Sequence, residues 1–386
     1  MNLSRYCADP GKAQNRHFGS SDNSETGNGP SPKRNRSKIN RLFLWTAIAV
    51  AAVMIIAAFI LVFPMLNKTA QHNTLIRIPA HATMQQMEDS IAKYLGAEYA
   101  TDTRRAYTIV SDKTLGPRHG AFEIEAGMTP FRAARQLARG GQTGISVTVN
   151  GQRTAEDVAH LFASKYEFSE EDFLKALKDS RNFNKYNTDT DHALTLFLED
   201  TYEFYWTVTP EEVIEAMNQN YKKFWNYNRI DSAESLHLLP REVVVLASIV
   251  DAETNMAGEK GTIGRLYINR LEKNMKLQSD PTVIYATGDF GITRVGGDML
   301  RNPSPYNTYM HEGLPPGPIR VTSTATIDAI LTSRPNNYLY MCADESLNGS
   351  HNFAVTFEEH KENVKRYTRE LDRKGITLRP ADDDPD

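Results

Sequence analysis

Two carboxylates, Asp251 and Glu253, follow the apolar run "VVLASIV" (residues 244–250). Pro240 favours a helix start, so the sequence predicts a helix that runs from this proline through both acids. Residues seven positions apart share a helix face, whereas residues two positions apart point about 200° away from each other. The two acids therefore cannot flank one scissile bond, which disfavours a two-carboxylate glycosidase built from this pair.

Glu253 is the better candidate for chemistry, because its predicted helix face is apolar. That face also carries Leu246, Ile249 and Val250. Asp251 instead lies in line with Val244, Ala247 and Ser248. Desolvation raises the pKa of a carboxyl group and keeps it protonated closer to neutral pH, as a general acid requires. A structural ion pair of Glu253 with Arg265 or Arg270 is the competing interpretation, and the spacing leaves both open.

Residues 42–63, "LFLWTAIAVAAVMIIAAFILVF", are predicted to span a membrane, because they contain no charged residue. A helix of this length extends about 33 Å, enough for a bilayer core of roughly 30 Å. The segment is too long for a cleaved signal peptide and begins too far along the chain. Five Lys/Arg residues fall within 33–41, so the positive-inside rule predicts a cytosolic N-terminus and an extracytoplasmic chain after Pro64.

The 386 residues are 40% hydrophobic and 24% charged, which is ordinary for a globular protein of about two or three domains. Residues 1–41 differ, because they are poor in large apolar side chains and are predicted to be disordered. They carry eight Lys/Arg and three acidic residues, although the whole chain has a net charge of −4. Such a basic cluster can bind nucleic acid, but its position beside the predicted membrane segment indicates instead that it sets the orientation of that segment in the membrane. Cys7 and Cys342 fall on opposite sides of the predicted membrane, so we expect no disulfide within the chain.

The chain beyond the membrane segment alternates predicted strands and helices, which indicates an α+β fold. The first part is predicted to contain a strand at 74–80, helices at 84–95 and 101–113, and a strand at 120–126. This β-α-α-β order is similar to the small LysM type of glycan-binding module, which we expect over 70–142. A helix at 129–139 is predicted to follow within the same module.

A connecting region is expected over 143–237, with a strand at 144–150 and helices beginning at Thr154 and Ser169. Its aromatic residues fit either a sugar-stacking wall or helix packing. A catalytic domain of mixed α/β structure is expected over 238–378, and an acidic tail over 379–386.

Six motifs in this domain resemble, in order, those of the endolytic murein transglycosylases, the MltG or YceG-like family. They are "LASIVDAET", "INRL" (268–271), "MKLQSDPTVIYATG" (275–288), "SPYNTYMHEGLPPGPI" (304–319), "YLYMCAD" (338–344) and "HNFAVTFEEH" (351–360). The resemblance is strong over 240–370 and extends more loosely back to residue 74, including "FLEDTYEFY" (197–205).

This resemblance implies a single-pass enzyme of the bacterial inner membrane. Such an enzyme cuts the bond between N-acetylmuramic acid and N-acetylglucosamine within nascent peptidoglycan strands, leaves 1,6-anhydro ends and terminates strand elongation. The second acid of the family's Glu-x-Glu-Thr pattern is catalytic and falls on Glu253, whereas Asp251 replaces the first. One acid suffices, because the muramic C6 hydroxyl attacks its own C1 and no activated water is needed.

The other motifs are expected to shape the cleft or to maintain the fold. Asp280 and Thr282 flank Pro281 in a predicted turn before the strand-like "VIYA". Tyr306, Asn307 and Thr308 suit acetamido sugars, and residues 313–317 form a rigid loop. His351 and Asn352 precede the alternating "FAVTF" and are expected to reach substrate. Supporting roles are expected for Asp251, Asp200 and Tyr202. Glu199 stands where the family has proline.

Neither a cofactor nor a metal is expected, since His311, His351 and His360 match no standard zinc spacing. The expected partners are peptidoglycan strands and the membrane, with no nucleic acid. Cell-wall synthases and division proteins are left open as protein partners. Two other functions compete: a membrane-tethered glycan-binding or division scaffold, and a muramidase-type hydrolase that uses water and a second carboxylate such as Asp280 or Asp344. The ends of the digested strands distinguish all three.

Overall fold

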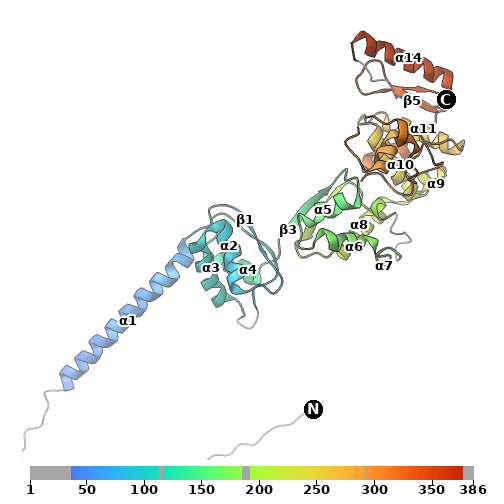
Figure 1. The fold of residues 1–386 in the computed structure, drawn as a ribbon. Helices are drawn as coiled ribbons and strands as arrows, with labels where there is room; N and C mark the ends of the chain where they lie inside the picture. The colour runs from blue at the N-terminus through green and yellow to red at the C-terminus, as the bar shows by residue number, and fades with distance from the viewer. Residues whose placement is uncertain (1–35, 113–115, 185–191, 293, 377–386) are drawn as a thin grey trace, which may run out of the picture. The chain divides into compact units, whose positions relative to one another are not determined.

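The structure is a computed structural model that describes residues 36–112, 116–184, 192–292 and 294–376 (Figure 1). Most of the tail predicted to be disordered lies outside these residues, as do Cys7 and the acidic tail at 379–386. The last residues of that tail differ from the prediction, because helix α1 (Arg36–Asn67) already begins at Arg36.

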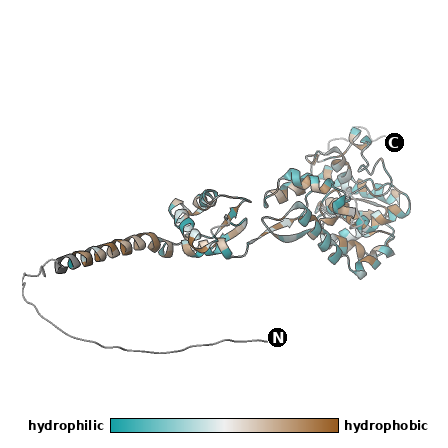
Figure 2. Cartoon of the chain, turned by 90° about the horizontal axis from the view of Figure 1, so that it is seen from below, coloured by the Kyte–Doolittle hydropathy of each residue, from teal (hydrophilic) through white to brown (hydrophobic). Residues whose placement is uncertain are grey.

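Helix α1 contains the predicted membrane segment. From Arg41 to Asn67 it is long and apolar enough to cross a membrane, and no second helix of the described residues meets both conditions. Its large apolar side chains between Leu42 and Phe63 are exposed, and the helix is mainly brown in Figure 2. A helix that is apolar all round and not packed in a core is suited to lipid. The chain therefore has one helix compatible with a single-pass anchor.

The first hydrophobic cluster after α1 is built from two strands and three helices. They are β1 (Thr74–Ile78), α2 (Met84–Leu95), α3 (Ala97–Val110), β2 (Gly120–Ile124) and α4 (Pro130–Arg139). The strands pair antiparallel, with Thr74 opposite Ile124. The Thr83 hydroxyl caps α2, and Thr129 caps α4 ahead of Pro130. The predicted element order is confirmed, whereas the assignment to the LysM type stays a prediction.

A second cluster is formed by the elements that follow. They are β3 (Gly144–Val149), α5 (Ala155–Ala163), α6 (Glu170–Lys178), α7 (Arg181–Asn184), η1 (Ala193–Leu196, a 3₁₀ helix), β4 (Asp200–Tyr205) and α8 (Pro210–Phe224). Strands β3 and β4 are antiparallel, with Gly144 opposite Tyr205. The Phe162 ring stacks on Phe173 at 5.2 Å and meets Phe197 edge-on. Phe197, which lies in the aromatic-rich stretch, therefore serves packing.

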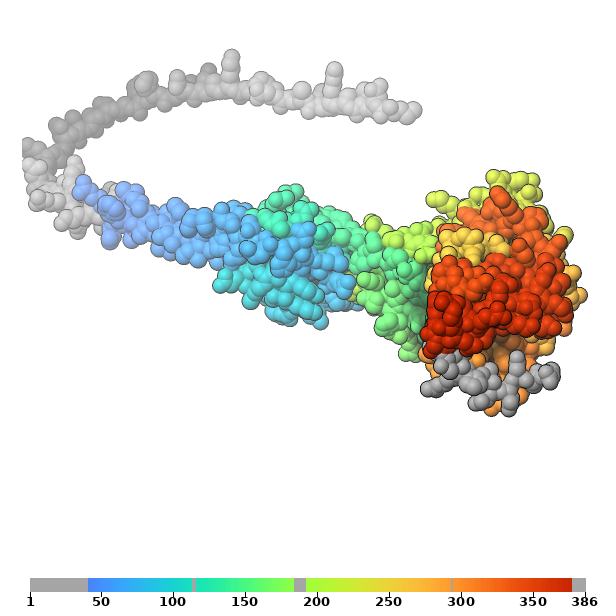
Figure 3. All heavy atoms as spheres, turned by 90° about the horizontal axis from the view of Figure 1, so that it is seen from above, coloured from blue at the N-terminus to red at the C-terminus, as the bar shows by residue number. Residues whose placement is uncertain are grey.

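The third cluster includes Val250 and Ala252, which are next to the two acids of the opening motif in the chain. The elements of this part of the chain are α9 (Tyr227–Ser235), α10 (Pro240–Glu253), α11 (Lys260–Glu272), α12 (Asp280–Thr287), η2 (Gly297–Arg301, a 3₁₀ helix), α13 (Thr324–Leu331), β5 (Tyr340–Ala343), β6 (His351–Ala354) and α14 (Phe357–Arg373). Helix α14 forms part of the red surface in Figure 3, and its Phe357 and His360 rings pack on Tyr340 of β5. Every sheet of the described residues is a two-stranded antiparallel pair, which agrees with the α+β class.

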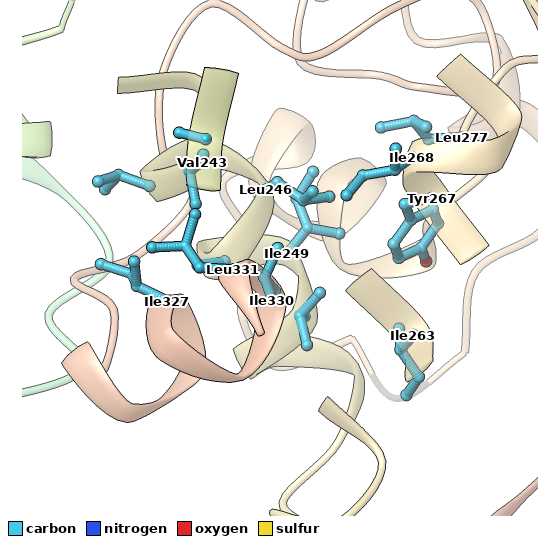
Figure 4. Close-up of a cluster of buried hydrophobic side chains, with 14 of the residues drawn as sticks. Val243, Leu246, Ile249, Ile263, Tyr267, Ile268, Leu277, Ile327, Ile330 and Leu331 are labelled. Carbon is cyan, nitrogen blue, oxygen red and sulfur yellow. The ribbon is translucent and has the colours of Figure 1, made fainter. Parts of the chain in front are cut away.

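Helix α10 is the centre of this third cluster. All of its residues from Val243 to Asp251 are buried. Figure 4 shows Leu246 and Ile249 among side chains of α11 and α13. These two helices approach closely at Gly264, where a Cβ atom would lie 2.5 Å from Ile330 Cγ1. Because protein interiors are packed without large voids, these contacts fix the position of α10 within the cluster.

Two sequence predictions in this region are wrong in part. Residues 280–287 form helix α12 and not a turn followed by a strand. Pro281 fits the first turn of a helix, and a short apolar run such as "VIYA" is ambiguous between strand and helix. The alternating "FAVTF" is a strand only as far as Ala354, because Thr356 caps α14.

Candidate active site

Glu253 is the last residue of α10, and two hydroxyl groups from other parts of the chain bind its carboxyl group. Tyr267 Oη, on α11, donates to Glu253 Oε1 at 2.7 Å, and Ser279 Oγ donates to the same oxygen at 2.5 Å. The Glu253 side chain is partly buried. Both bonds end on the same oxygen, Oε1.

Burial raises the pKa of Glu253 above its ordinary value. The hydroxyls of Ser279 and Tyr267 stabilise the carboxylate and act in the opposite direction, but they do not outweigh burial. Asp280 raises the pKa further through its negative charge, whereas His351 lowers it. The raised pKa predicted from the apolar helix face is confirmed.

Tyr267 keeps its phenolic proton, and the backbone around Ser279 fixes the direction of the serine side chain. Burial, together with the negative charge of Glu253, raises the pKa of Tyr267, so this residue stays a phenol and donates its proton. Gln278, just before Ser279, has a positive φ of 48°, a conformation that non-glycine residues rarely adopt. The Ser279 backbone N–H donates to Thr308 Oγ1 at 3.0 Å, and Thr282 Oγ1 donates to the Ser279 carbonyl at 2.6 Å. This turn directs the Ser279 hydroxyl group toward the carboxyl group of Glu253.

Three of the residues expected to bind sugar are buried inside the protein: Thr282, Asn307 and Thr308. The Thr282 and Thr308 hydroxyls bond to each other at 2.8 Å. The Asn307 amide donates to the carbonyls of Leu300 and Asn302. Their polar groups are used within the fold, so in this structure they support Ser279 and the following loop instead of facing a substrate.

Tyr306 and Asp280 remain accessible. Tyr306 is partly buried, its ring lies 4.7 Å from the ring of Tyr285, and both tyrosines line a pocket of about 510 Å³. Asp280 is exposed, and its carboxylate accepts a hydrogen bond of 2.7 Å from Tyr309 Oη. Sugar binding by these two residues stays a prediction.

His351 and Asn352 lie at the start of β6 and have acidic partners. Glu259 accepts from the His351 backbone N–H at 2.9 Å and bonds to its Nδ1 at 2.8 Å. The Asn352 amide donates to Glu345. His351 acts on Glu253 through its charge, as described above, whereas Asn352 is turned toward Glu345.

Asp251 is buried and binds a different set of partners. Its carboxylate accepts from Lys260 Nζ at 2.7 Å, from Thr322 Oγ1 at 2.6 Å and from the Ser323 backbone N–H at 2.8 Å, and also from Thr326 Oγ1. Burial alone would raise the pKa of Asp251, but these bonds outweigh it and lower the pKa. The two acids therefore face different surroundings, as the helical wheel predicted.

The other residues considered from the sequence lie apart from this arrangement. Arg265 pairs with Glu272, and Arg270 donates to backbone carbonyls at Leu277 and Leu339, so neither forms the ion pair considered for Glu253. Exposed Asp200 accepts from the Thr201 backbone N–H. Tyr202 Oη donates to the Leu198 carbonyl. Within the described residues, no group of three or more His, Cys, Asp and Glu side chains could hold a metal.

A family model described as the YceG-like family matches residues 65–366. The chain belongs to the YceG-like family. This confirms the resemblance that the six sequence motifs indicated.

Relatives of this YceG-like chain carry one shared description. An endolytic murein transglycosylase of Bacillus subtilis (strain 168) is 29% identical over 323 residues, which are 78% of this chain and 86% of that protein. Two proteins of the same description from Streptococcus pneumoniae, strains D39 and R6, are each 29% identical over 161 residues, 41% of this chain but only 28% of theirs. A crystal structure of a YceG-like protein from Listeria monocytogenes has a TM-score of 0.49 and 22% identity, covering 75% of this chain and 98% of that one.

Sequence reasoning did not identify Tyr267 and Ser279 as partners of Glu253. Both stand in or beside quoted motifs: Tyr267 directly precedes "INRL", and Ser279 lies within "MKLQSDPTVIYATG". A hydroxyl residue inside an ordered motif is therefore the signal that could have directed attention to them.

Replacing Asp251 with Asn should destabilise this YceG-like protein. Asn cannot balance the charge of Lys260, and breaking a buried ion pair on one side costs roughly 3–5 kcal/mol of unfolding free energy. Because the folded pKa of Asp251 is lowered, its stabilising contribution is present above the unfolded pKa of about 3.9 and is lost as the pH falls through the folded pKa. Denaturant unfolding of the full chain in detergent should show a large difference at pH 7 that shrinks below pH 4.

The matched control is Asp298→Asn, which breaks an exposed pair with Arg301. Such pairs contribute about 0–1 kcal/mol. Equal stability of Asp251→Asn and the wild type at pH 7 would contradict the role given to Asp251.

Proposed function

We propose that this chain is a lytic transglycosylase that cuts the β-1,4 bond between N-acetylmuramic acid and N-acetylglucosamine within peptidoglycan strands. The observation that carries the proposal is the state of Glu253. Its pKa is raised by burial, and its Oε1 is occupied by Tyr267 and Ser279 while Oε2 is available. Membership of the YceG-like family and the shared description of the relatives support it.

In the first half of the reaction, Glu253 acts as an acid. Its raised pKa keeps the carboxyl group protonated at higher pH than an exposed glutamate. The proton on Oε2 passes to the glycosidic oxygen, the C1–O bond breaks, and its electron pair stays with the N-acetylglucosamine oxygen. The developing carboxylate is then stabilised on Oε1 by the two hydroxyl donors.

In the second half, the same group acts as a base. The C6 hydroxyl of the muramic acid attacks its own C1 and gives its proton to Glu253, which restores the acid. Atoms balance without water, and the product is a 1,6-anhydro end. Since nucleophile and electrophile belong to one sugar, high effective molarity replaces the second carboxylate.

One observation keeps a hydrolase as the second candidate. The charge of Asp280 acts on Glu253, so a second, exposed carboxylate lies in the neighbourhood of the acid. A muramidase could use it to activate water or as a nucleophile. The chemical nature of the new strand end decides between the two reactions.

Replacing Glu253 with Gln should abolish cleavage. Gln keeps the size of the side chain but has no proton to transfer, so turnover should fall by about 10²–10⁴-fold or more. Mass spectrometry of wild-type digests should find 1,6-anhydro-N-acetylmuramic acid at the new ends. Glu272→Gln, which alters an exposed acid at the end of α11, is the matched control and should keep its activity. Asp251→Asn should lose far less activity per folded molecule. Reducing ends in the wild-type digest would identify water as the nucleophile and overturn the transglycosylase mechanism.

Replacing Tyr267 with Phe should move the pH profile. The Tyr267 hydroxyl lowers the pKa of Glu253, so its removal should raise that pKa and shift the alkaline limb of kcat/KM to higher pH. Tyr338→Phe removes a hydroxyl in the same cluster without touching Glu253, and its profile should match the wild type. An alkaline limb that stays in place or moves to lower pH in Tyr267→Phe would contradict this assignment.

The proposal requires the active site to lie outside the cytoplasm. Five basic residues precede the apolar part of α1, which supports an N-terminus in the cytosol of a bacterial cell. Protease added to intact spheroplasts should therefore degrade the chain after Pro64 and spare a fragment that contains the basic tail. Degradation of the tail alone would show the opposite orientation, in which the active site could not reach peptidoglycan.

The remaining parts of the chain take supporting roles in this proposal. Residues 70–142 are assigned to glycan binding on their β-α-α-β order, and binding of isolated sacculi is the measurement that tests them. The region 143–237 would supply the rim of the cleft in front of the catalytic domain at 238–378. Termination of nascent strands, with cell-wall synthases or division proteins as partners, stays a prediction.

A further inference from the structure

A small pocket is lined by the residue that precedes Glu253 in the chain. Its volume is about 140 Å³, close to the roughly 150 Å³ of a cavity that holds benzene. Ala252 lines it and precedes Glu253, while Pro281 lines it and follows Asp280. The other lining residues are Arg153, Ile284, Tyr285, Phe290, Ile292, Ile319 and Arg320. The pocket therefore combines two cations with apolar and aromatic side chains, and its Ala252 is the neighbour of the acid in the chain.

The two arginines bring positive charge that the pocket itself does not neutralise. Arg320 is partly buried, its Nη1 donates to the Asp251 carbonyl at 3.3 Å, and its Nε is buried without a hydrogen-bond partner. The Arg153 guanidinium lies 4.7 Å from the centre of the Phe290 ring. Among the described residues no ion pair of either arginine is found and no lining residue is acidic, whereas the charges of Glu156 and Asp157 act on Tyr285 of the same lining. Such a site favours an anion.

The loop between β3 and α5 is fitted against Arg320. Gly151 has a positive φ of 69°, and a Cβ atom at this position would lie 2.6 Å from Arg320 Nη2. The Val321 backbone N–H donates to the Gln152 carbonyl at 2.7 Å, which fixes the loop beside the arginine. Because Arg153 follows in the same loop, both guanidinium groups line one pocket although they are far apart in the sequence.

We propose that this pocket binds a free carboxylate of the peptide attached to the lactyl group of the muramic acid. The inference rests on the proposed function, since the peptide belongs to the sugar whose C1 is cleaved and must leave the glycan close to Glu253. A guanidinium group pairs with a carboxylate through two parallel hydrogen bonds, and the apolar wall suits the alkyl groups of a short peptide. The neutral sugars of the glycan would need neither cation.

A larger pocket adjoins the small one and is the place where the rest of the peptide would bind. Tyr285 and Phe290 line both this pocket and the larger one of about 510 Å³ that contains Tyr306. Carboxylate recognition in the small pocket would therefore leave room for further residues along the same wall. The result is an enzyme that selects strands by peptide charge as well as by sugar.

The test uses the full chain and three forms of one preparation of lipid-free glycan strands. The first carries peptides with free carboxylates, the second carries the same peptides with these carboxylates amidated, and the third is stripped of peptides by an amidase, which leaves only the lactyl carboxylate. Formation of 1,6-anhydro ends gives kcat/KM for each. The wild type should prefer the free-acid strands by about tenfold or more, the effect of one hydrogen bond to a charged group.

Two variants should reduce this preference. Arg153→Ala removes an exposed cation, and Arg320→Lys keeps the charge of a partly buried one but loses the paired geometry. The matched control is Arg369→Ala, which removes an exposed arginine of α14 and should keep the wild-type ratio. Because the ratio is taken within each variant, a loss of folded protein does not alter it.

Either of two results would overturn the inference: a wild type that cuts the free-acid and the amidated strands equally, or both variants keeping the full preference. Failure of the proposed function looks different, since the wild type would then form no anhydro ends on any strand.

Discussion

The ion pair and hydrogen bonds of the buried Asp251 carboxylate hold together the elements that carry the site. This carboxylate ties the C-terminal turn of α10 to Lys260 at the start of α11 and to the segment at 322–326 that begins α13. Ser248, one turn earlier on the same face, accepts from the Ile319 backbone N–H. A buried carboxylate is stable when its oxygens accept hydrogen bonds and an ion pair. These contacts therefore fix α10, α11 and the segment at 322–326 in one arrangement relative to one another. That arrangement fixes the helix end from which Glu253 projects.

Two acids on one helix thereby acquire opposite properties. Asp251 receives a cation and several donors, and its pKa is lowered, whereas burial dominates at Glu253 and raises the pKa. The difference comes from the partners and not from the residue type, since both are carboxylic acids. Separation of proton affinities between neighbouring carboxyl groups is the usual way in which a protein divides structural and catalytic work.

The parts of this site that follow from local periodicity could be predicted from the sequence. The helical wheel placed the two acids on different faces, because the period of 3.6 residues needs only the helix itself. The contacts of Tyr267 and Ser279 with Glu253 depend on how α11 and the turn at Gln278 pack, which no local pattern encodes. Residue type alone also could not show that the Thr308 hydroxyl is used inside the fold. Helix α12 was missed because four apolar residues fit either period.

The position of Glu253 at the very end of α10 has an electrostatic consequence. The unpaired carbonyl groups of a last helical turn carry partial negative charge, equivalent to roughly half an electron. Burial is the largest cause of the raised pKa of Glu253; the field of these carbonyls would add to it, and the Arg320 guanidinium, which donates to the Asp251 carbonyl, would offset it. The usual size of the helix-end field, about 0.3–1 kcal/mol, is below one pKa unit. The end of α10 thus links the acid to the small pocket, because Arg320 both lines that pocket and donates to a main-chain carbonyl of the last turn.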